Sequence, residues 1–600
     1  MRKALLHIVR QYFSNFYYFY KHLRYKIFIF LFLSIIASIM DGFGLAMFLP
    51  LFKLISDDAV DHSSVEMGNL SFLVDGMKGL GLEINLVTIL GILLFFFVMK
   101  GVVKIIAGYL QVVYRQFFIR TLRTKNLQFL ASYSYSNFVL ADAGKIQNTL
   151  SGEIGRVVSA YTTYMQVIKS SVTLIVYCVL ALLSNPQFAI LVAVGGYLTN
   201  FIFRKMYVKT KQLSRDLVKT GHGMQGLLIQ HIEYFKYLKA TGLMKIYSGK
   251  LIKKVHELEE TNRKIGVIDA IMQGLREPTL IFVVVVVILI QVELLGGSMG
   301  LIILSILFFY RALTQVMQLQ TAWNQFLSYS GSIENLTGFT ADLVAGKEKL
   351  GKKKFEGLQN FIKFENVNFS YGNVSTLKNI NLGINKYETI AFVGESGSGK
   401  STLMNLICGM LIPNSGRILV DDVALSEFNT HSFSQRIGYI TQEPVIFDDT
   451  IFNNVTFWSE KTPENYERFF NALKKASIDN FVLEQELKED SRLGHNGINL
   501  SGGQKQRFSI ARELYKDIDI LIMDEATSAL DSETEKTIQT NIEALKGNYT
   551  ILIVAHRLST IKNSDRIVVL KKGEVMQIGT YEELIKLGTD FKKMVELQEL

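Results

Sequence analysis

Six long apolar stretches dominate the first half of the chain. They cover residues 26–52, 86–113, 167–184, 187–203, 267–292 and 299–318, and only "SNPQ" separates the third from the fourth. Each stretch is close to the roughly 20 apolar residues that a helix needs to cross a bilayer core. The pattern predicts an α-helical transmembrane domain of six spans over residues 26–340.

Residues 1–25 precede the first span and are rich in aromatic and basic side chains. The segment lacks the small-residue cleavage site of a targeting signal and continues directly into a full-length span. It is therefore predicted to form an amphipathic helix at the membrane interface.

Charge predicts how the spans are oriented. Residues 1–26 hold six Lys or Arg and residues 204–264 hold fourteen, whereas residues 55–86 hold six acids and one base. By the positive-inside rule, both termini are cytoplasmic in a multi-pass protein of the cell membrane. The formal net charge of +10 lies largely beside apolar helices, which favours membrane topology over nucleic-acid binding. Two cysteines indicate neither a disulfide framework nor a metal-ligand cluster.

The stretches between spans two and three and between spans four and five are long and basic. They are typical either of a solvated charged surface or of helices that continue beyond the bilayer as stalks. The second interpretation is favoured because each stretch contains a segment on which a helix pair could turn. These segments are "NFVLADAGKIQ" from Asn137 and "KTGHGMQG" from Lys219.

The composition changes after the last span. A polar, lysine-rich linker is predicted at residues 341–357, which include "AGKEKLGKKKFEG". Beyond it, short β-rich runs such as "ETIAFVG" and "DILIMDE" alternate with helical patterns over residues 358–600. This alternation predicts an α/β domain with a largely parallel sheet.

A phosphate-binding loop is predicted at "GESGSGKS", which follows the strand "TIAFV" and precedes a helical pattern. Its glycines let backbone N–H groups turn toward phosphates, and the helix N-terminus adds positive potential. Lys400 would reach the β- and γ-phosphates, and the Ser401 hydroxyl would ligate Mg²⁺. The candidate ATP-binding residues of this loop are Gly394, Glu395, Ser396, Gly397, Ser398, Gly399, Lys400, Ser401 and Thr402.

Two adjacent carboxylates, Asp524 and Glu525, end the apolar strand "ILIM". Successive side chains of a strand point to opposite sides, so only one of the two serves the metal. We interpret Asp524 as a Mg²⁺ ligand and Glu525 as the catalytic group that polarises an attacking water. A structural ion pair is the alternative.

Residues 500–504 read "LSGGQ". Together with the phosphate loop, "DEATSALD" and "VAHRLS", this signature makes the chain closely resemble the ATP-binding cassette ATPases. The six preceding spans look like an exporter-type half-transporter. The resemblance covers essentially the whole chain and implies a homodimer in which each ATP lies between one subunit's phosphate loop and the other subunit's signature loop. A heterodimer stays open.

The resemblance also implies roles for single residues. Tyr371 would stack on adenine, although it could equally be a core residue. Gln442 would join the Mg²⁺ and water shell, and His556 would contact the γ-phosphate. Asp531 would bridge the two cassettes. The signature contacts would come from Ser501, Gly502, Gly503 and Gln504.

One feature departs from that pattern. Many exporter cassettes have an acidic and a basic residue shortly before the signature, whereas His495 and Asn496 stand there in this chain. The departure concerns contacts with the cytoplasmic helices and leaves the hydrolytic residues unaffected.

Three functional classes are compatible with cassette motifs alone. The spans exclude a soluble cassette protein that acts on DNA or ribosomes, and the pair of Glu525 and His556 favours an ATP-hydrolysing exporter over a nucleotide-gated channel or regulator. "SIMDGFGLAMFLPLF", "FFYRALTQVMQ" and an external helix around "NLSFLVDGMKGL" look like the bacterial branch that includes lipid-linked oligosaccharide flippases. A multidrug, general lipid or peptide exporter is the alternative.

Four bases lie inside the predicted spans, where charge is costly. Lys100 and Lys104 share one face of span two, Arg276 lies in span five and Arg311 in span six. These bases are candidates to bind the phosphate or pyrophosphate headgroup of a lipid substrate. The alternative is that Lys104 extends to the interface while Glu277 and Asp41 neutralise the arginines.

Overall fold

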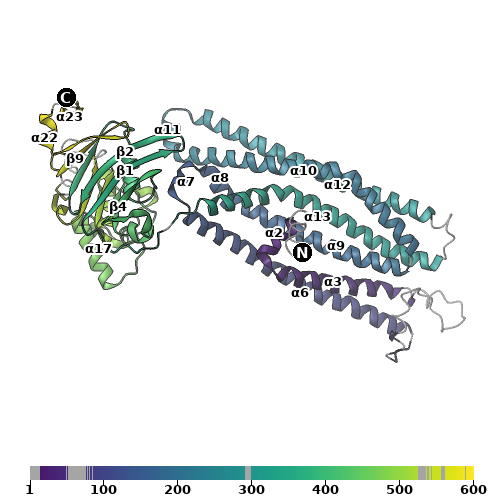
Figure 1. Ribbon diagram of the computed structural model, residues 1–600. Helices are drawn as coiled ribbons and strands as arrows, with labels where there is room; N and C mark the ends of the chain where they lie inside the picture. The colour runs from purple at the N-terminus through teal and green to yellow at the C-terminus, as the bar shows by residue number, and fades with distance from the viewer. Residues whose placement is uncertain are drawn as a thin grey trace. The chain divides into compact units, whose positions relative to one another are not determined.

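The computed structural model forms two compact units (Figure 1). The first consists of Met1–Tyr133 and Leu140–Lys347, and the second of Ser134–Val139 and Glu348–Leu600. The described residues are 14–48, 50–51, 76–77, 79, 81–83, 85–184, 186–290, 299–349, 351–524, 536, 540–541, 543–555, 561–587 and 590–599.

The regular elements of the first unit's described residues are all helices. Its elements are α2 (Ser14–Leu23), α3 (Lys26–Ala46), α6 (Leu86–Ala131), α8 (Ala143–Asn148), a π-helical turn at Thr149–Glu153, α9 (Ile154–Ser184), α10 (Pro186–Glu233), α11 (Phe235–Ala240), α12 (Met244–Leu289) and α13 (Met299–Ala345). The short helix α7 (Tyr135–Leu140) lies where the chain passes between the units. Figure 1 shows the long helices running lengthwise beside one another. The predicted long helical extensions are confirmed, because α6, α10, α12 and α13 each exceed 45 residues.

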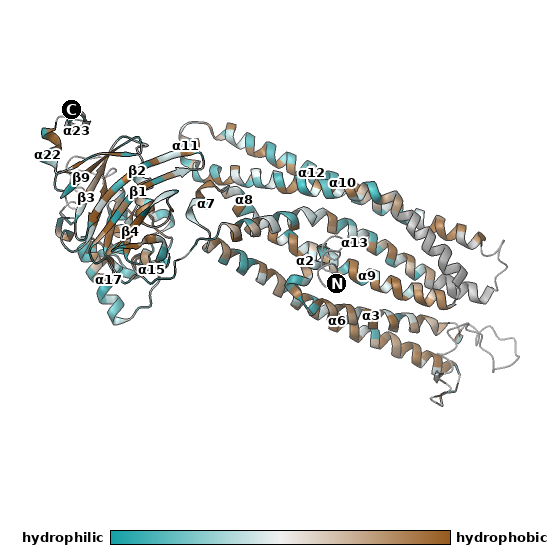
Figure 2. Cartoon of the chain, in the orientation of Figure 1, coloured by the Kyte–Doolittle hydropathy of each residue, from teal (hydrophilic) through white to brown (hydrophobic). Residues whose placement is uncertain are grey.

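Three segments of the described chain are long and apolar enough to cross a membrane. They are Lys26–Ala46, Leu86–Ala131 and Ala143–Leu183, and Figure 2 shows hydrophobic residues along much of α3 and α6. The three later predicted spans fall in α10, α12 and α13, whose apolar stretches include side chains outside the described set. The bounds of all six spans stay predictions.

The first predicted break between stalk helices is confirmed, and the second is wrong. The chain breaks between α7 and α8, where the Asp142 side chain accepts a hydrogen bond from Lys145 N at 3.0 Å. In contrast, α10 runs unbroken through "KTGHGMQG" and ends at Glu233. Its glycines permit close packing instead of a turn, since a Cβ on Gly144 of α8 would lie 2.7 Å from Gly226 Cα.

The N-terminal helix α2 packs its aromatic side against α6 and α9. Phe19 is fully buried, with its ring 5.9 Å from that of Phe118 and 5.1 Å from that of Tyr164. Residues 1–13 and most of the predicted external helix around "NLSFLVDGMKGL" lie outside the described residues. The interfacial position of residues 1–25 stays a prediction.

The second unit contains two sheets. An antiparallel sheet has the order β2-β1-β4-β5, and a six-stranded sheet has the order β10-β9-β3-β8-β7-β6. The strands are β1 (Phe361–Tyr371), β2 (Val374–Asn385), β3 (Thr389–Val393), β4 (Ser415–Val420), β5 (Val423–Ala424), β6 (Ile437–Ile440), β7 (Ile520–Asp524), β8 (Thr550–Val554), β9 (Arg566–Lys571) and β10 (Glu574–Gly579). Among the described strands of the larger sheet, only β10 pairs antiparallel, so the predicted largely parallel sheet is confirmed.

Helices cover both faces of the larger sheet. They are α14 (Lys400–Ile407), α15 (Thr430–Ser434), α16 (Ile451–Thr456), α17 (Pro463–Lys475), α18 (Asp479–Glu484), α19 (Gly502–Tyr515), α22 (Tyr581–Lys586) and α23 (Asp590–Glu599). All five side chains of β3 are buried, and the four apolar ones divide between two hydrophobic clusters, Ala391 and Val393 in one and Ile390 and Phe392 in the other. A strand buried on both faces reads as a continuous apolar run, as "TIAFV" does.

Candidate functional sites

The order of the parallel strands gathers the predicted nucleotide residues at one edge of the sheet. Strands β3, β8, β7 and β6 are neighbours and run parallel, so their carboxyl ends meet at the same edge. The phosphate loop follows β3, Asp524 ends β7, and Gln442 comes two residues after β6. Ligands of open α/β sheets bind at this edge.

The phosphate loop requires glycine at particular positions. Gly394 and Gly399 have φ of +154° and +104°, and a Cβ on Gly394 would lie 2.2 Å from Leu570 O. A Cβ on Gly397 would have no described atom within 4 Å, so the space beside that residue is open. The loop is thus shaped by its backbone and leaves room for a ligand.

Lys400 begins α14 and folds back over the loop. Its ammonium donates hydrogen bonds to Gly394 O at 2.8 Å and Glu395 O at 3.0 Å. Ser398 Oγ is buried and has no hydrogen-bond partner among the described residues. An ammonium and an unpaired hydroxyl at the N-terminus of a helix fit a phosphate ligand.

Asp524 is oriented by a residue that the sequence analysis missed. The Tyr439 hydroxyl donates to Asp524 Oδ2 at 3.3 Å from the adjacent strand β6. Burial and the nearby Asp524 carboxylate raise the pKa of Tyr439, which keeps the phenol protonated as a donor. Ser401, Gln442 and Asp524 offer the oxygen ligands that Mg²⁺ prefers, so this donor set fits the metal.

The signature loop caps a helix of 14 residues, α19. Ser501 Oγ accepts from Gln504 N at 3.2 Å, and Gln504 Oε1 accepts from Ser501 N at 2.9 Å, which forms a capping box. Gly502 and Gly503 are the first two residues of the helix, where the N–H groups have no partner within the helix. Ser501 and Gly502 are exposed, so this helix end is open to a ligand.

The loop before the signature has an irregular backbone. Asn496 adopts a φ of +51°, and its carbonyl accepts a hydrogen bond from Lys505 Nζ at 2.8 Å. His495 and Asn496 are both exposed. In place of an acidic and basic pair, this loop has a hydrogen bond between Asn496 and Lys505 of the following helix, α19.

Tyr371 lies at the end of β1 and is partly buried. Its ring packs edge-on against Phe369, with ring centroids 4.9 Å apart. The adenine and core interpretations both stay open. Glu525, Asp531 and His556 lie outside the described residues, and their roles stay predictions.

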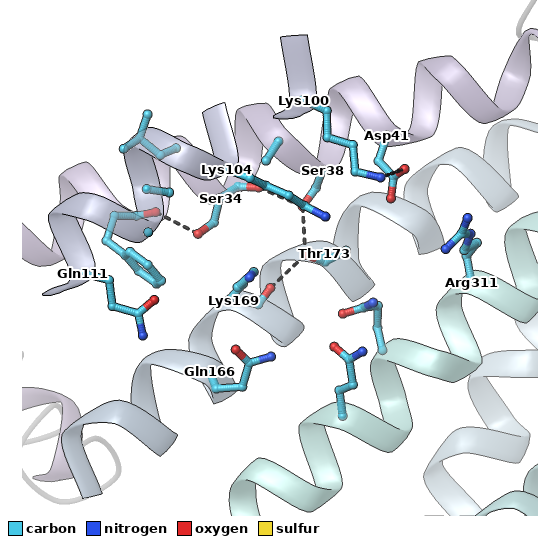
Figure 3. A pocket seen from close by; sticks show the side chains of 17 residues that line it. Ser34, Ser38, Asp41, Lys100, Lys104, Gln111, Gln166, Lys169, Thr173 and Arg311 are labelled. Carbon is cyan, nitrogen blue, oxygen red and sulfur yellow. Dashed lines mark hydrogen bonds and ion pairs between the residues drawn. The ribbon is translucent and has the colours of Figure 1, made fainter. Parts of the chain in front are cut away.

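A cavity of about 500 Å³ lies among α3, α6, α9 and α13 of the first unit. Three of the four predicted bases line it, namely Lys100, Lys104 and Arg311 (Figure 3). Lys169 lines it as well, although the sequence analysis overlooked this base at the start of span three. The tertiary structure thus brings four bases from three helices to one space.

One carboxylate faces these bases. Asp41 is 8% exposed and accepts hydrogen bonds from Lys100 Nζ and from the Tyr177 hydroxyl. It does not pair with Arg311, so the expectation that Asp41 neutralises that arginine is wrong. No carboxylate among the described residues forms an ion pair with Lys104, Lys169 or Arg311.

The fourth predicted base lies elsewhere. Arg276 of α12 is 1% exposed and donates a hydrogen bond to the Thr321 hydroxyl of α13. It does not line the cavity, and the expected ion pair with Glu277 is absent from the described contacts. Arg276 is thus buried apart from the other predicted bases, and its contact with the substrate stays a prediction.

The two halves of the chain match two family models. Residues 31–318 match the ABC transporter transmembrane region, and residues 377–528 match the ABC transporter model. The chain is 30% identical over 458 residues to the ATP-dependent lipid A-core flippase of Cupriavidus pinatubonensis, covering 74% of this chain and 76% of that protein. The chain therefore belongs to the ABC transporter family.

Within that family the chain is an exporter whose ATPase domain binds ATP and is coupled to transmembrane transport. It is 29% identical over 505 residues to the ATP-dependent lipid A-core flippase of Ralstonia nicotianae, covering 81% of this chain and 83% of that protein. A solved bacterial Atm1-family ABC exporter with ATP bound matches 96% of this chain and 99% of its own with a TM-score of 0.76. At 20% identity, that match supports the exporter fold alone.

Proposed function

We propose that this exporter works as a homodimer that moves a lipid or lipid-linked glycan with a phosphate-containing headgroup from the cytoplasmic to the outer leaflet. The observation that carries the proposal is the cavity in the membrane unit, where four bases face a single carboxylate. The relatives named lipid A-core flippases support the same substrate class.

The charge of the cavity matches a diphosphate. Lys100 is neutralised by Asp41, which leaves Lys104, Lys169 and Arg311 as positive charges in excess. A translocon-based scale sets the cost of one such charge at the centre of a membrane helix at about 2.5–3.5 kcal/mol, so a chain retains several only where they have a use. Arg311 adds the planar fork that binds phosphate oxygens in pairs.

The roles proposed in the nucleotide site are supported by the geometry of its described residues and, for the others, by the family alone. Lys400 and the loop N–H groups would bind the ATP phosphates, and Ser401, Gln442 and Asp524 would hold Mg²⁺, which would supply charge neutralisation at the phosphates. Glu525 acts as the general base, with His556 at the γ-phosphate. Tyr371 stacks on adenine.

The substrate proposal is tested with a defined lipid. The purified protein in nanodiscs receives polyprenyl diphosphate, and the ATPase rate is measured relative to the basal rate of each variant. We expect that the double variant Lys169→Gln/Arg311→Gln loses the stimulation. Arg120→Gln, an exposed base on α6 outside the cavity, is the matched control and keeps it.

A wild-type response in that double variant would show that the bases serve structure rather than the substrate. Size-exclusion elution checks that both variants remain folded. The stimulation should also weaken at high salt, since the attraction between the bases and the headgroup is screened.

The homodimer has its own test. In a head-to-tail dimer, the Ser501 of one subunit faces the ATP held by Lys400 of the other. Mixing Lys400→Ala chains with Ser501→Arg chains therefore produces dimers with one doubly damaged site and one intact site. We expect binding of a single ATP per mixed dimer by equilibrium dialysis. Two equivalent occupied sites would contradict the arrangement.

A further inference from the structure

The membrane cavity is divided along its length into a charged end and an amide end. On α6 the charged and amide residues that line it are Lys100, Lys104 and Gln111, and on α13 they are Arg311 and two glutamines. Seven residues of helix separate Lys104 from Gln111, which corresponds to about 10 Å at 1.5 Å per residue. The same seven-residue spacing separates Arg311 from Gln318 on α13.

The directions of the four helices bring their charged residues to one end of the cavity and most of their amide residues to the other. Helices α3 and α9 run opposite to α6 and α13 in the first unit (Figure 1). The early cavity residues of α6 and α13 therefore meet the late ones of α3 and α9. Lys100 accordingly contacts Asp41 near the end of α3. Figure 3 shows Asp41, Lys100 and Arg311 on one side of the cavity and Gln111 and Gln166 on the other.

Lys104 and Lys169 lie between these two ends in Figure 3. Gln166 precedes Lys169 by one helical turn on α9, and Gln315 follows Arg311 by one turn on α13. The order along the cavity is therefore carboxylate with bases, then bases beside Gln315, then the amides of Gln111, Gln166 and Gln318. By the orientation that the basic loops predict, the amide end faces the cytoplasm.

The glutamine side chains at the amide end have few contacts within the chain. In the described part of the chain, Gln111, Gln315 and Gln318 make no side-chain hydrogen bond, and Gln166 Nε2 reaches only Ser170 Oγ at 3.4 Å. A carboxamide carries two donors and an acceptor, so Gln111, Gln166 and Gln318 offer an uncharged surface that both donates and accepts. Sugar hydroxyls, which also donate and accept, match that surface better than phosphates or acyl chains do.

We propose that the amide end is a glycan subsite. The diphosphate of the substrate binds Lys104, Lys169 and Arg311, and the first sugars lie against Gln166 and Gln318, on the cytoplasmic side of the phosphates. This inference rests on the proposed function and adds the orientation of the headgroup. It makes the exporter selective for a glycosylated lipid diphosphate over a bare one.

The test compares two lipids whose diphosphates carry the same charge. The methyl ester of polyprenyl diphosphate, here the bare lipid, and the same lipid carrying a diphosphate-linked disaccharide are titrated into nanodiscs, and half-maximal stimulation of the ATPase is measured. Wild type should respond to the glycosylated lipid at lower concentration. In Gln166→Leu/Gln318→Leu, the preference should fall by about tenfold, since each lost hydrogen bond to a neutral group has a modest net free energy.

Gln116→Leu is the matched control, because Gln116 is exposed on α6 and lies outside the cavity. It should keep the full preference. If the double variant still responds to the bare lipid, it is folded and active. Gln166→Ala/Gln318→Ala serves as a second variant if the leucines disturb packing.

The outcomes separate the two proposals. If the double glutamine variant keeps the wild-type preference, the glycan subsite is wrong while the phosphate function stands. If wild type responds equally to both lipids, the subsite is again wrong. If wild type responds to neither lipid, the proposed function fails and the subsite fails with it.

Discussion

Asp41 is the residue at which the charge of the membrane cavity can be changed with the least change in shape. In Asp41→Asn, the side chain keeps its size but loses its negative charge and one of its two acceptor oxygens. Lys100 Nζ and the Tyr177 hydroxyl, which both donate to Asp41, then compete for a single acceptor. We expect tighter binding of an anionic headgroup together with lower stability.

The magnitude of the binding effect follows from Coulomb's law. Removing one negative charge about 10 Å from a doubly charged ligand gains at most about 3 kcal/mol at an effective dielectric constant of about 20. Screening over a Debye length of about 8 Å lowers this to about 1 kcal/mol, or about a fivefold decrease in Kd. The gain should shrink further as salt is raised.

The stability effect has the opposite sign. Breaking a buried ion pair by removing one partner costs about 3–5 kcal/mol. The side chains of Lys100 and Asp41 are 13% and 11% accessible, and Lys100 lines the cavity, so we expect the lower end of that range. Differential scanning fluorimetry of the detergent-solubilised protein measures the change.

Tyr177→Phe is the control that separates charge from hydrogen bonding. It removes one donor to Asp41 but leaves the carboxylate paired with Lys100, so the stability should fall by about 1.5 kcal/mol. The Kd for polyprenyl diphosphate should be unchanged in this variant. If Asp41→Asn is folded and binds the lipid no more tightly than wild type, Asp41 does not oppose the ligand and the electrostatic reasoning fails.

Two further predictions concern the nucleotide site and the helix packing. Glu525→Gln should cut steady-state ATP turnover by about 10²–10⁴-fold while ATP binding persists, because the general base is lost; near-wild-type phosphate release would contradict this assignment. Gly331→Ala should lower stability by about 1–3 kcal/mol, because the added Cβ would lie 2.7 Å from Ser214 O on α10. Its control, Gly338→Ala on the same helix, meets no described atom within 4 Å and should be neutral or stabilising, which a thermal melt would show.

Each motif of the nucleotide site could be predicted because the residues within it are contiguous in sequence. The phosphate loop follows a buried strand and opens a helix, and both boundaries appear as apolar and glycine patterns. The signature likewise carries its own helix cap in Ser501 and Gln504. Such motifs can be recognised in the sequence because the residues of the motif determine the local backbone conformation.

Glycine, in contrast, was misread in α10. A cluster of three glycines is typical of a turn, but here it lies in an unbroken helix that packs closely on α8 at Gly226. The sequence shows that glycine is present. Whether it serves a turn or a close contact depends on the neighbouring helix.

By itself, the sequence determined the apolar helices, the parallel-sheet ATPase domain and the order of its motifs. Only the tertiary structure decided which bases share a space, because a span carries side chains on all sides and packing selects the face that meets a cavity. It brought Lys169 and four glutamines to the cavity, and it placed Arg276 of α12 in a hydrogen bond with Thr321 of α13. It also paired Asp41 with Lys100, since the antiparallel course of α3 and α6 brings the end of one beside the start of the other.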